Sequence, residues 1–321
     1  MNKVKEYLKK RYNMEDRQSF LFNYIMIGFP FIVFCFLWVS ININSILLAF
    51  QGDFGGFTLD HFKRAFVAFF DEDPYLMALG GGNLMQLIGR SFFLWVNIYI
   101  VCQIPSLFSS YVLYKKIPGH YVFRVIFMIP AILNGIVWVM IMKNMLSYNG
   151  PIMGLLKLFG YVPPADAAVN GFLGSYETAF PTIALMTILP HLVGFNMIIS
   201  GAYARIPGTL FEVGKLEGIG FLKEFFIISI PLVWPTITVG LIAGFSSMLI
   251  YDGQVYLYTA GKYRTGTMGF YLYYLTVQLS QAGTKYYGYP AAIGLIMTLV
   301  TIPIVLVGKF VLERLIEPVE Y

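Results

Sequence analysis

The sequence predicts an all-α protein that crosses a membrane six times. Of its 321 residues, 58% are hydrophobic and only 12% are charged, whereas soluble domains carry about 25% charged residues. The mean hydropathy is +0.69. A chain so long and so poor in charge cannot hide its apolar side chains in one core, so lipid is the solvent that we expect around it.

Six apolar stretches define the expected helices. Each approaches the ~20 residues that a helix needs to cross the hydrocarbon of a bilayer. The first stretch follows a basic segment, as in a signal peptide, but it is too long and no small-x-small cleavage site follows it, so we expect a retained helix. The predicted spans are 20–41, 91–113, 122–142, 180–202, 226–250 and 289–310.

The distribution of basic residues predicts the orientation. If the N-terminus is cytoplasmic, so are segments 1–19, 114–124, 203–226 and 310–321, which together with Lys309 hold 14 of the 22 Lys and Arg residues. Basic residues concentrate on the cytoplasmic side of membrane proteins. We therefore predict a multi-pass protein of the cell membrane with both termini inside. The net charge of +5 has the same explanation, so we expect no nucleic-acid partner.

Residue patterns for catalysis, metal binding and ATP hydrolysis are missing from the sequence. His61, His120 and His191 form no HExxH motif and have no Cys or carboxylate at metal-ligand spacing. We expect His191 to be a hydrogen-bonded core residue, and Cys35 and Cys102 to be small core side chains. No GxxxxGK[ST] phosphate loop and no GxSxG motif occurs. We expect no catalytic residue and no metal site.

Polar residues within the predicted spans are candidates for a solute pathway. They are costly to remove from water and often line a route through a membrane protein. Asn97, Gln103, Asn134 and Asn196 are of this kind, and the last two lie close to a glycine, where a helix can bend. The alternative is a side-chain hydrogen bond that joins two helices, worth ~0.6 kcal/mol. Both interpretations stay open.

The stretch SSMLIYDGQVYLYTAGKY, at the external end of the fifth predicted span, is rich in tyrosine. Aromatic faces with a few hydrogen-bond acceptors suit stacking on sugar rings, and they equally suit an aromatic belt at the membrane interface. The candidate pathway residues are therefore Asn134, Asn196, Tyr251, Asp252 and Gln254.

One predicted cytoplasmic loop, FEVGKLEGIG at 211–220, carries most of the polarity in its neighbourhood. Pro207 can begin a short helix, and Glu212 lies early in that helix, where a carboxylate offsets the positive end of the helix dipole. Gly214 leaves one flank thin, and Gly218 permits a sharp backbone turn. We expect an exposed helix shaped to fit a socket on a partner.

The run EVGKLEGIG, followed by an apolar stretch that ends at Pro231, resembles the EAA motif of ABC importer permeases. Glu212 takes the place of the first Glu, small residues replace the two alanines, and Glu217 with Gly218 stands for the usual Asp-Gly pair. The coupling residues that the resemblance implies are Glu212, Gly214, Glu217 and Gly218.

The resemblance covers about residues 80–315. NGPIMGLLKLFG looks like the external helix of the family, and TAGKYRTGTMGFYLYYL with YYGYPAAIGL looks like the last loop and span of its carbohydrate permeases, most like the first permease subunit of maltose-type systems. It implies the type I ABC importer permease fold. Residues 1–79 would form an N-terminal segment, helix and external loop, and 80–321 a five-helix core with a coupling loop at about 203–226.

The resemblance also implies a division of labour. Two permeases, different from each other, would enclose the pathway, and an extracellular binding protein would deliver a sugar, in the first place an oligosaccharide. Two separate ATPase subunits would bind ATP and Mg and each receive one coupling helix, so this chain would hold no cofactor and would not be an enzyme. The spans would rotate as rigid bodies between inward and outward states.

Two alternatives stay beside this expectation. An ion-coupled secondary transporter usually places charged residues at mid-membrane, whereas here they fall almost wholly outside the predicted spans. Within the importer class, glycerol phosphate or a polyol are alternatives to a sugar.

Overall fold

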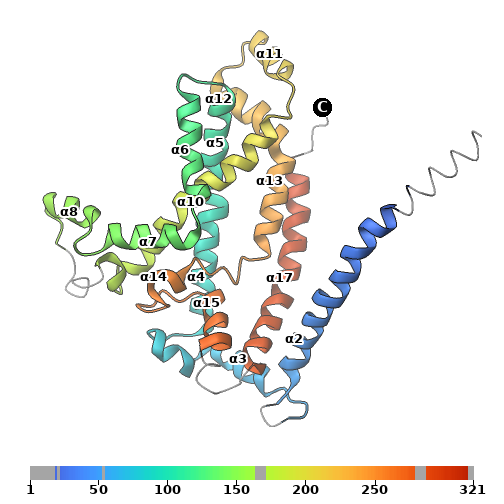
Figure 1. Ribbon diagram of the computed structural model, residues 1–321, viewed down its shortest axis with the longest axis vertical. Helices are drawn as coiled ribbons and strands as arrows, with labels where there is room; N and C mark the ends of the chain where they lie inside the picture. Colours follow the sequence, from blue (N-terminus) through green and yellow to red (C-terminus); the bar gives the residue numbers. More distant parts are fainter. Residues whose placement is uncertain (1–18, 20–21, 53–54, 163–170, 279–286, 317–321) are drawn as a thin grey trace, which may run out of the picture.

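The computed structural model describes residues 19, 22–52, 55–162, 171–278 and 287–316. Within them, five helices are long and apolar enough to cross a membrane, and a bent helix pair makes a sixth crossing when it is counted as one span (Figure 1). The predicted all-α membrane fold is confirmed. The five helices are Phe22–Phe50, Leu84–Tyr114, Ala179–Tyr203, Phe221–Phe245 and Gly288–Leu315.

Several spans contain a short turn of π-helix. In Leu84–Tyr114 the closing bond runs from the Cys102 N–H to the Asn97 carbonyl (2.9 Å), and such a turn interrupts a helix without ending it. The segments of the spans are η1 (Phe34–Val39), α2 (Ser40–Phe50), α4 (Leu84–Val96), η3 (Asn97–Val101), α5 (Gln103–Tyr114), α10 (Ala179–Tyr203), α12 (Phe221–Glu224), η5 (Phe225–Ser229), α13 (Ile230–Phe245) and α17 (Gly288–Leu315). The other helices are α3 (Asp60–Phe70), η2 (Pro74–Leu79), α6 (His120–Ile132), α7 (Gly135–Leu146), α8 (Pro151–Leu158), η4 (Gly171–Gly174), α11 (Thr209–Leu216), α14 (Val255–Thr259), α15 (Met268–Tyr273) and η6 (Tyr274–Gln278).

The third predicted span, 122–142, consists of two helices joined at nearly a right angle. The axes of His120–Pro130 and Gly135–Leu158 differ by 95°. Pro130 has no N–H to donate to the preceding turn, and Leu133 adopts an extended backbone (ψ 132°) that ends α6. Proline is often tolerated inside membrane helices, so the sequence pattern did not show this break.

The first span runs to Phe50, beyond its predicted end at 41. Asn42 donates to the Trp38 carbonyl (2.7 Å) and Ser45 to the Ile41 carbonyl (3.0 Å), so polar side chains here are satisfied within the helix. In Figure 1 this helix leans away from the other spans and meets them near α3 and α17. The division at residues 79 and 80 stays a prediction.

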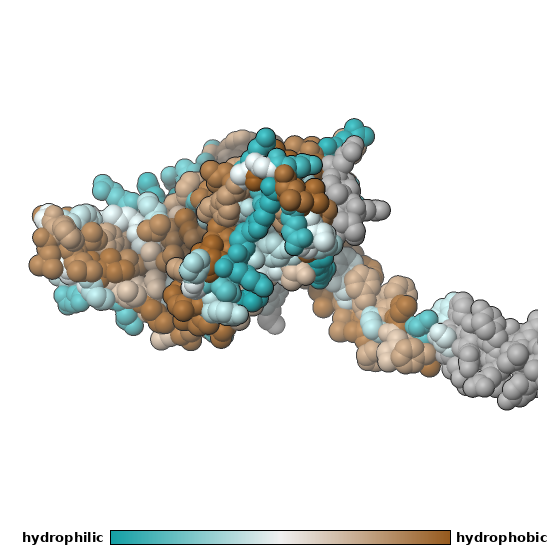
Figure 2. Space-filling model, turned by 90° about the horizontal axis from the view of Figure 1, so that it is seen from above, coloured by the Kyte–Doolittle hydropathy of each residue, from teal (hydrophilic) through white to brown (hydrophobic). Residues whose placement is uncertain are grey.

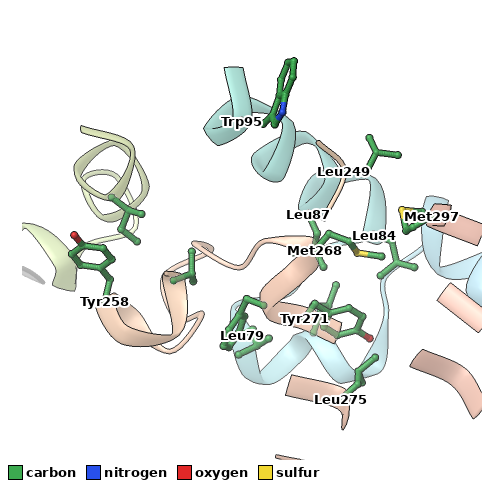
Figure 3. Close-up of a cluster of buried hydrophobic side chains, with 14 of the residues drawn as sticks. Leu79, Leu84, Leu87, Trp95, Leu249, Tyr258, Met268, Tyr271, Leu275 and Met297 are labelled. Atoms are coloured by element: carbon green, nitrogen blue, oxygen red, sulfur yellow. The ribbon is translucent and has the colours of Figure 1, made fainter. Parts of the chain in front are cut away.

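The larger hydrophobic core is formed by buried side chains of α3, α4, α7, α10, α14, α15 and α17. Met268 is fully buried and lies beside Leu84 and Leu87 (Figure 3). The Trp95 indole N–H donates to the Gly244 carbonyl (2.8 Å), which ties α4 to α13 inside this core.

The bundle has two different ends. α11 stands beyond the spans at one end, where α17 also finishes, whereas α3 and α15 lie toward the other end (Figure 1). Seen from above, hydrophilic residues gather over the middle of the molecule, with hydrophobic residues around them (Figure 2). We call the end of the bundle at α11 the α11 end, and the end at α3 and α15 the opposite end.

Candidate functional site

The loop singled out in the sequence forms the short helix α11 and a turn closed by glycine. Gly218 has a left-handed backbone (φ 72°). Its N–H donates to the Lys215 carbonyl (3.1 Å), and the Ile219 N–H donates to the Gly214 carbonyl (2.9 Å). This is the Schellman arrangement, in which glycine is favoured because other residues are strained at positive φ. Gly218 therefore makes the sharp turn that its position predicts.

α11 has an outward face and an inward face. Glu212 and Glu217 are exposed on the outward face, and Leu216 is 88% exposed. Gly214 is buried against Ile228, where an added Cβ would lie 2.7 Å from the Cδ1 atom. The thin flank at Gly214 therefore receives Ile228 of the protein's own η5, and the coupling role of Gly214 stays a prediction.

A buried ion pair joins the end of α5 to α12 beside the inward face of α11. Lys115 Nζ pairs with Glu224 Oε1, and the Glu224 residue is only 3% exposed. The Tyr111 hydroxyl donates to the same carboxylate oxygen (3.0 Å). Lys115 Nζ also lies 4.5 Å from the ring centroid of Phe211, a buried residue of α11. The ends of α5, α11 and α12 therefore meet at one charged contact.

Neither Lys115 nor Glu224 is predicted as a functional residue from the sequence. The available signal was the place of Glu224, two residues before the fifth predicted span, where a charged side chain entering a membrane needs a partner. Beside the ion pair, the Tyr203 hydroxyl is hydrogen-bonded to the Ser229 hydroxyl, which joins α10 to η5. The inward face of α11 thus rests on a cluster that reaches three spans.

Tyr251 lies beside the α10 span and not only at the outer edge of the fifth. Its carbonyl accepts a bond from the Ser91 hydroxyl (2.8 Å), and its own hydroxyl lies 3.5 Å from His191 Nε2. Burial raises the pKa of Tyr251, so the hydroxyl stays protonated. His191 Nδ1 donates to the Thr187 carbonyl (2.7 Å). His191 is therefore hydrogen-bonded as expected, and its second nitrogen faces Tyr251.

Asn134 and Gln254 come close together at the break between α6 and α7. The exposed Asn134 side chain accepts from the Ile136 N–H (2.9 Å), so Asn134 is the N-cap of α7. Gln254 has a left-handed backbone (φ 57°), and its Nε2 would lie 2.7 Å from a Cβ added at Gly135. Capping is therefore a further role for Asn134, beside contact with solute and a hydrogen bond between helices.

Asp252 and Asn196 complete the set of pathway candidates. The exposed Asp252 carboxylate accepts from the Gln254 N–H (3.4 Å), and the Asp252 carbonyl accepts from the Thr267 hydroxyl (3.0 Å). Asn196 follows His191 on α10 by a little more than one turn, and its side chain lies outside the described part of the structure. The structure thus places four of the five candidates around the α7–α14 contact and the start of α14.

A second buried carboxylate, also missed in the sequence, lies toward the opposite end. Asp73 is 2% exposed, and its Oδ2 accepts from the hydroxyls of Tyr271 (2.7 Å) and Tyr289 (2.5 Å). Its Oδ1 accepts from the Tyr75 N–H (2.9 Å). Asp73 therefore ties η2 to α15 and α17. Within the described residues, no three His, Cys, Asp or Glu side chains are grouped to hold a metal ion.

Several curated relatives of this chain are permeases of sugar transport systems, whereas no family model matches it. The multiple sugar-binding transport system permease protein MsmF of Streptococcus mutans is 25% identical over 255 residues, 78% of this chain and 83% of its own. The arabinooligosaccharides transport system permease protein AraP of Halalkalibacterium halodurans is 23% identical, and the match covers 86% of this chain and 83% of AraP. The diacetylchitobiose uptake system permease protein NgcF of Streptomyces coelicolor is 27% identical, and the match covers 68% of this chain and 61% of NgcF.

A solved structure has the same fold. A chain of the bacterial alginate ABC transporter, crystallised with an alginate pentasaccharide-bound periplasmic protein, aligns with a TM-score of 0.74 at 18% identity over 94% of this chain and 96% of that chain. The chain is thus a multi-pass membrane protein with the fold of an ABC transporter permease. It is homologous to permease proteins of sugar transport systems.

Proposed function

We propose that this chain forms part of the pathway of an ATP-driven importer, and that the transported solute is a sugar, in the first place an oligosaccharide. A second, different permease subunit completes the pathway, and an extracellular binding protein delivers the solute. The support for the solute comes from the relatives, whose names refer to multiple sugars and arabinooligosaccharides. The support for a delivering protein is the alginate transporter, which was crystallised with a periplasmic protein.

The construction of α11 carries the proposal. Its outward face presents Leu216 between Glu212 and Glu217, and on its inward face the buried Phe211 packs against Lys115, which pairs with Glu224 of the fifth span. A partner that pushes on a helix held in this way moves the spans and does not merely bend a loop. Rigid coupling of this kind suits an element that transmits force between subunits.

ATP chemistry belongs to two partner ATPase subunits in this proposal. They hold ATP and Mg, and each receives one coupling helix, which in this chain is α11 with Glu212, Gly214, Glu217 and Gly218. The α11 end is cytoplasmic, as are both termini, and the concentration of Lys and Arg in the segments assigned to that side supports this orientation.

Gly218→Leu in the complex reconstituted with its partner subunits tests the proposal. Leucine is strained at φ 72°, and nothing lies within 4 Å of the added Cβ, so the change disturbs the turn and its outer surface without filling a packed site. We expect loss of solute-stimulated ATP hydrolysis and of ATPase pull-down. Membrane insertion is retained, because Gly218 lies outside the spans.

Gly160→Leu is the matched control. Gly160 (φ 85°) closes α8, with bonds from its own N–H to the Lys157 carbonyl and from the Tyr161 N–H to the Leu156 carbonyl, both 3.0 Å. Nothing lies within 4 Å of a Cβ added there either. This variant should keep both activities. Wild-type ATP hydrolysis and pull-down in Gly218→Leu would make FEVGKLEGIG an ordinary surface loop and remove the main support for the proposal.

The solute is tested separately, on the delivering protein. Binding of single solutes to it distinguishes an oligosaccharide from the alternatives, glycerol phosphate and a polyol. Tight binding of either alternative without oligosaccharide binding would overturn the sugar assignment and leave the importer proposal intact.

A further inference from the structure

A cavity of about 280 Å³ opens between α5, α6 and α10 at the α11 end. Its polar lining comes from hydroxyl groups and from basic side chains. The residues that matter here are Ser110, Tyr114, Lys116, His120, Arg124 and Ser200. A site of this size suits a small polar group and lies at the lower limit of ligand pockets, which begin at about 300 Å³.

The cavity carries positive charge without a compensating carboxylate. No Asp or Glu is among its lining residues, and none occurs in the sequence between residues 74 and 165. The neighbouring Lys115 pairs with Glu224, but in the described part of the chain no ion pair involves Lys116 or Arg124. Two cations therefore remain available to an anion that enters the cavity.

The backbone around the cavity is arranged to present these groups. Lys116 has a left-handed backbone (φ 52°), as does Gly119 (φ 84°), so the chain turns sharply before α6 begins. His120 Nδ1 donates to the Ile117 carbonyl (3.1 Å), which holds the ring in the cavity wall. Because α6 begins at His120, the positive end of its dipole adds to the charge of the two cations.

An exposed apolar stripe begins beside the cavity and runs along α6. Tyr121, Val125 and Ile129 are 75%, 60% and 53% exposed, and their spacing of four residues places them on one face of the helix. His120 and Arg124 have the same spacing and form the adjoining face. A basic pocket at the end of an apolar helix face matches an amphiphile with an anionic head and a hydrocarbon tail.

We propose that this cavity binds the phosphate group of an anionic phospholipid, with the acyl chains lying along α6. Lys116 and Arg124 contact the phosphate, and the hydroxyls of Ser110, Tyr114 and Ser200 surround the rest of the head group. The site lies in the membrane leaflet on the α11 side. The proposal depends on α6 entering the membrane and is independent of the transported solute.

Native mass spectrometry of the full-length chain in mild detergent tests the site. We expect phosphatidylglycerol to bind more tightly than phosphatidylcholine. Removal of one cation near an anionic lipid head group weakens binding roughly five-fold. K116Q or R124Q should therefore weaken phosphatidylglycerol binding about five-fold. The double variant should weaken it about twenty-five-fold. R124K should restore most of the binding.

The control is the double variant K63Q K262Q, which removes two exposed cations that do not line the cavity, one of them paired with Asp60, and should bind as the wild type does. Equal binding of the two lipids by the wild type, or unchanged binding by K116Q R124Q, overturns the proposal. Displacement of phosphatidylglycerol by glycerol phosphate at equal concentration also overturns it, because the site would then recognise a soluble phosphate ester. The lipid comparison and the competition use the unmodified chain, so they decide the question even if the double variant does not fold.

Discussion

Lys115 and Glu224 illustrate at the residue scale how a charged pair is kept inside a membrane protein. A buried carboxylate is costly unless it is paired and hydrogen-bonded, and Glu224 has both the Lys115 ammonium and the Tyr111 hydroxyl. Such a pair need not stabilise the fold relative to apolar residues, but the loss of one partner leaves an uncompensated charge. The pair therefore joins α5 to α12, and α11 reaches it through the contact between Phe211 and Lys115.

Lys115→Met should destabilise the chain by roughly 3–5 kcal/mol, because Glu224 is then left charged and buried. Adding Glu224→Gln should recover a large part of that loss, since the amide still accepts from Tyr111. Thermal unfolding of the single and double variants in detergent measures both effects. Lys63→Met, at an exposed pair with Asp60, should change stability by about 0–1 kcal/mol. Wild-type stability in Lys115→Met would show that the buried carboxylate of Glu224 does not need the Lys115 ammonium.

Substitutions on the two faces of α11 should have different effects: changes on the outward face should weaken partner binding, and changes on the inward face should lower stability. Leu216→Ser changes the outward face, so we expect normal folding and weaker ATPase pull-down. Phe211→Ala empties a buried site and should cost about 3–5 kcal/mol of stability. Glu212→Ala should weaken coupling only partially, because its dipole interaction is worth about 0.3–1 kcal/mol. Unaltered pull-down in Leu216→Ser would exclude the outward face as the contact.

The break between α6 and α7 marks the limit of helix prediction from this sequence. The apolar pattern across 122–142 is continuous, and neither Pro130 nor Asn134 distinguishes a kink from a break. What ends α6 is the extended backbone at Leu133, and what starts α7 is the Asn134 side chain. Both are local conformations that the neighbouring packing selects, including the approach of Gln254 to Gly135.

Asn134 variants separate capping from solute contact. Asn134→Ala removes the N-cap of α7 and should lower stability by about 0.5–2 kcal/mol, whereas Asn134→Asp keeps an acceptor for the Ile136 N–H and should be near wild type. Thermal unfolding and solute uptake are measured for both. If Asn134→Asp is stable but transports poorly, Asn134 contacts solute. If it is stable and transports normally, capping is its function.

Across the whole molecule, the membrane spans could be predicted from the sequence, whereas the buried polar contacts between distant segments could not. Apolar runs identified five spans and the bent pair, because each run needs only its own residues to be recognised. The buried polar contacts were missed, since they join residues far apart in the chain: Tyr111 and Glu224 are separated by 113 positions, and Asp73 and Tyr289 by 216. Segment composition predicts where the chain enters lipid, but long-range packing decides which polar side chains meet there.

The orientation of the whole molecule rests on the distribution of basic residues, and two cysteine substitutions test it. Cys35 and Cys102 are first replaced by alanine, so that added cysteines are the only thiols. Gly220 is exposed with negative φ (−71°), and nothing lies within 4 Å of an added Cβ, so cysteine fits there. Asp71 is exposed at the end of α3, toward the opposite end of the bundle (Figure 1).

In intact cells, an impermeant maleimide should label Asp71→Cys and leave Gly220→Cys unmodified, because the Lys- and Arg-rich segments remain in the cytoplasm. After permeabilisation both cysteines should react, which shows that the protection of Gly220→Cys comes from the membrane and not from burial. Labelling of Gly220→Cys alone in intact cells would invert the topology. It would place α11 on the side without ATP, so α11 could not couple to an ATPase, and the phospholipid site would then lie in the outer leaflet.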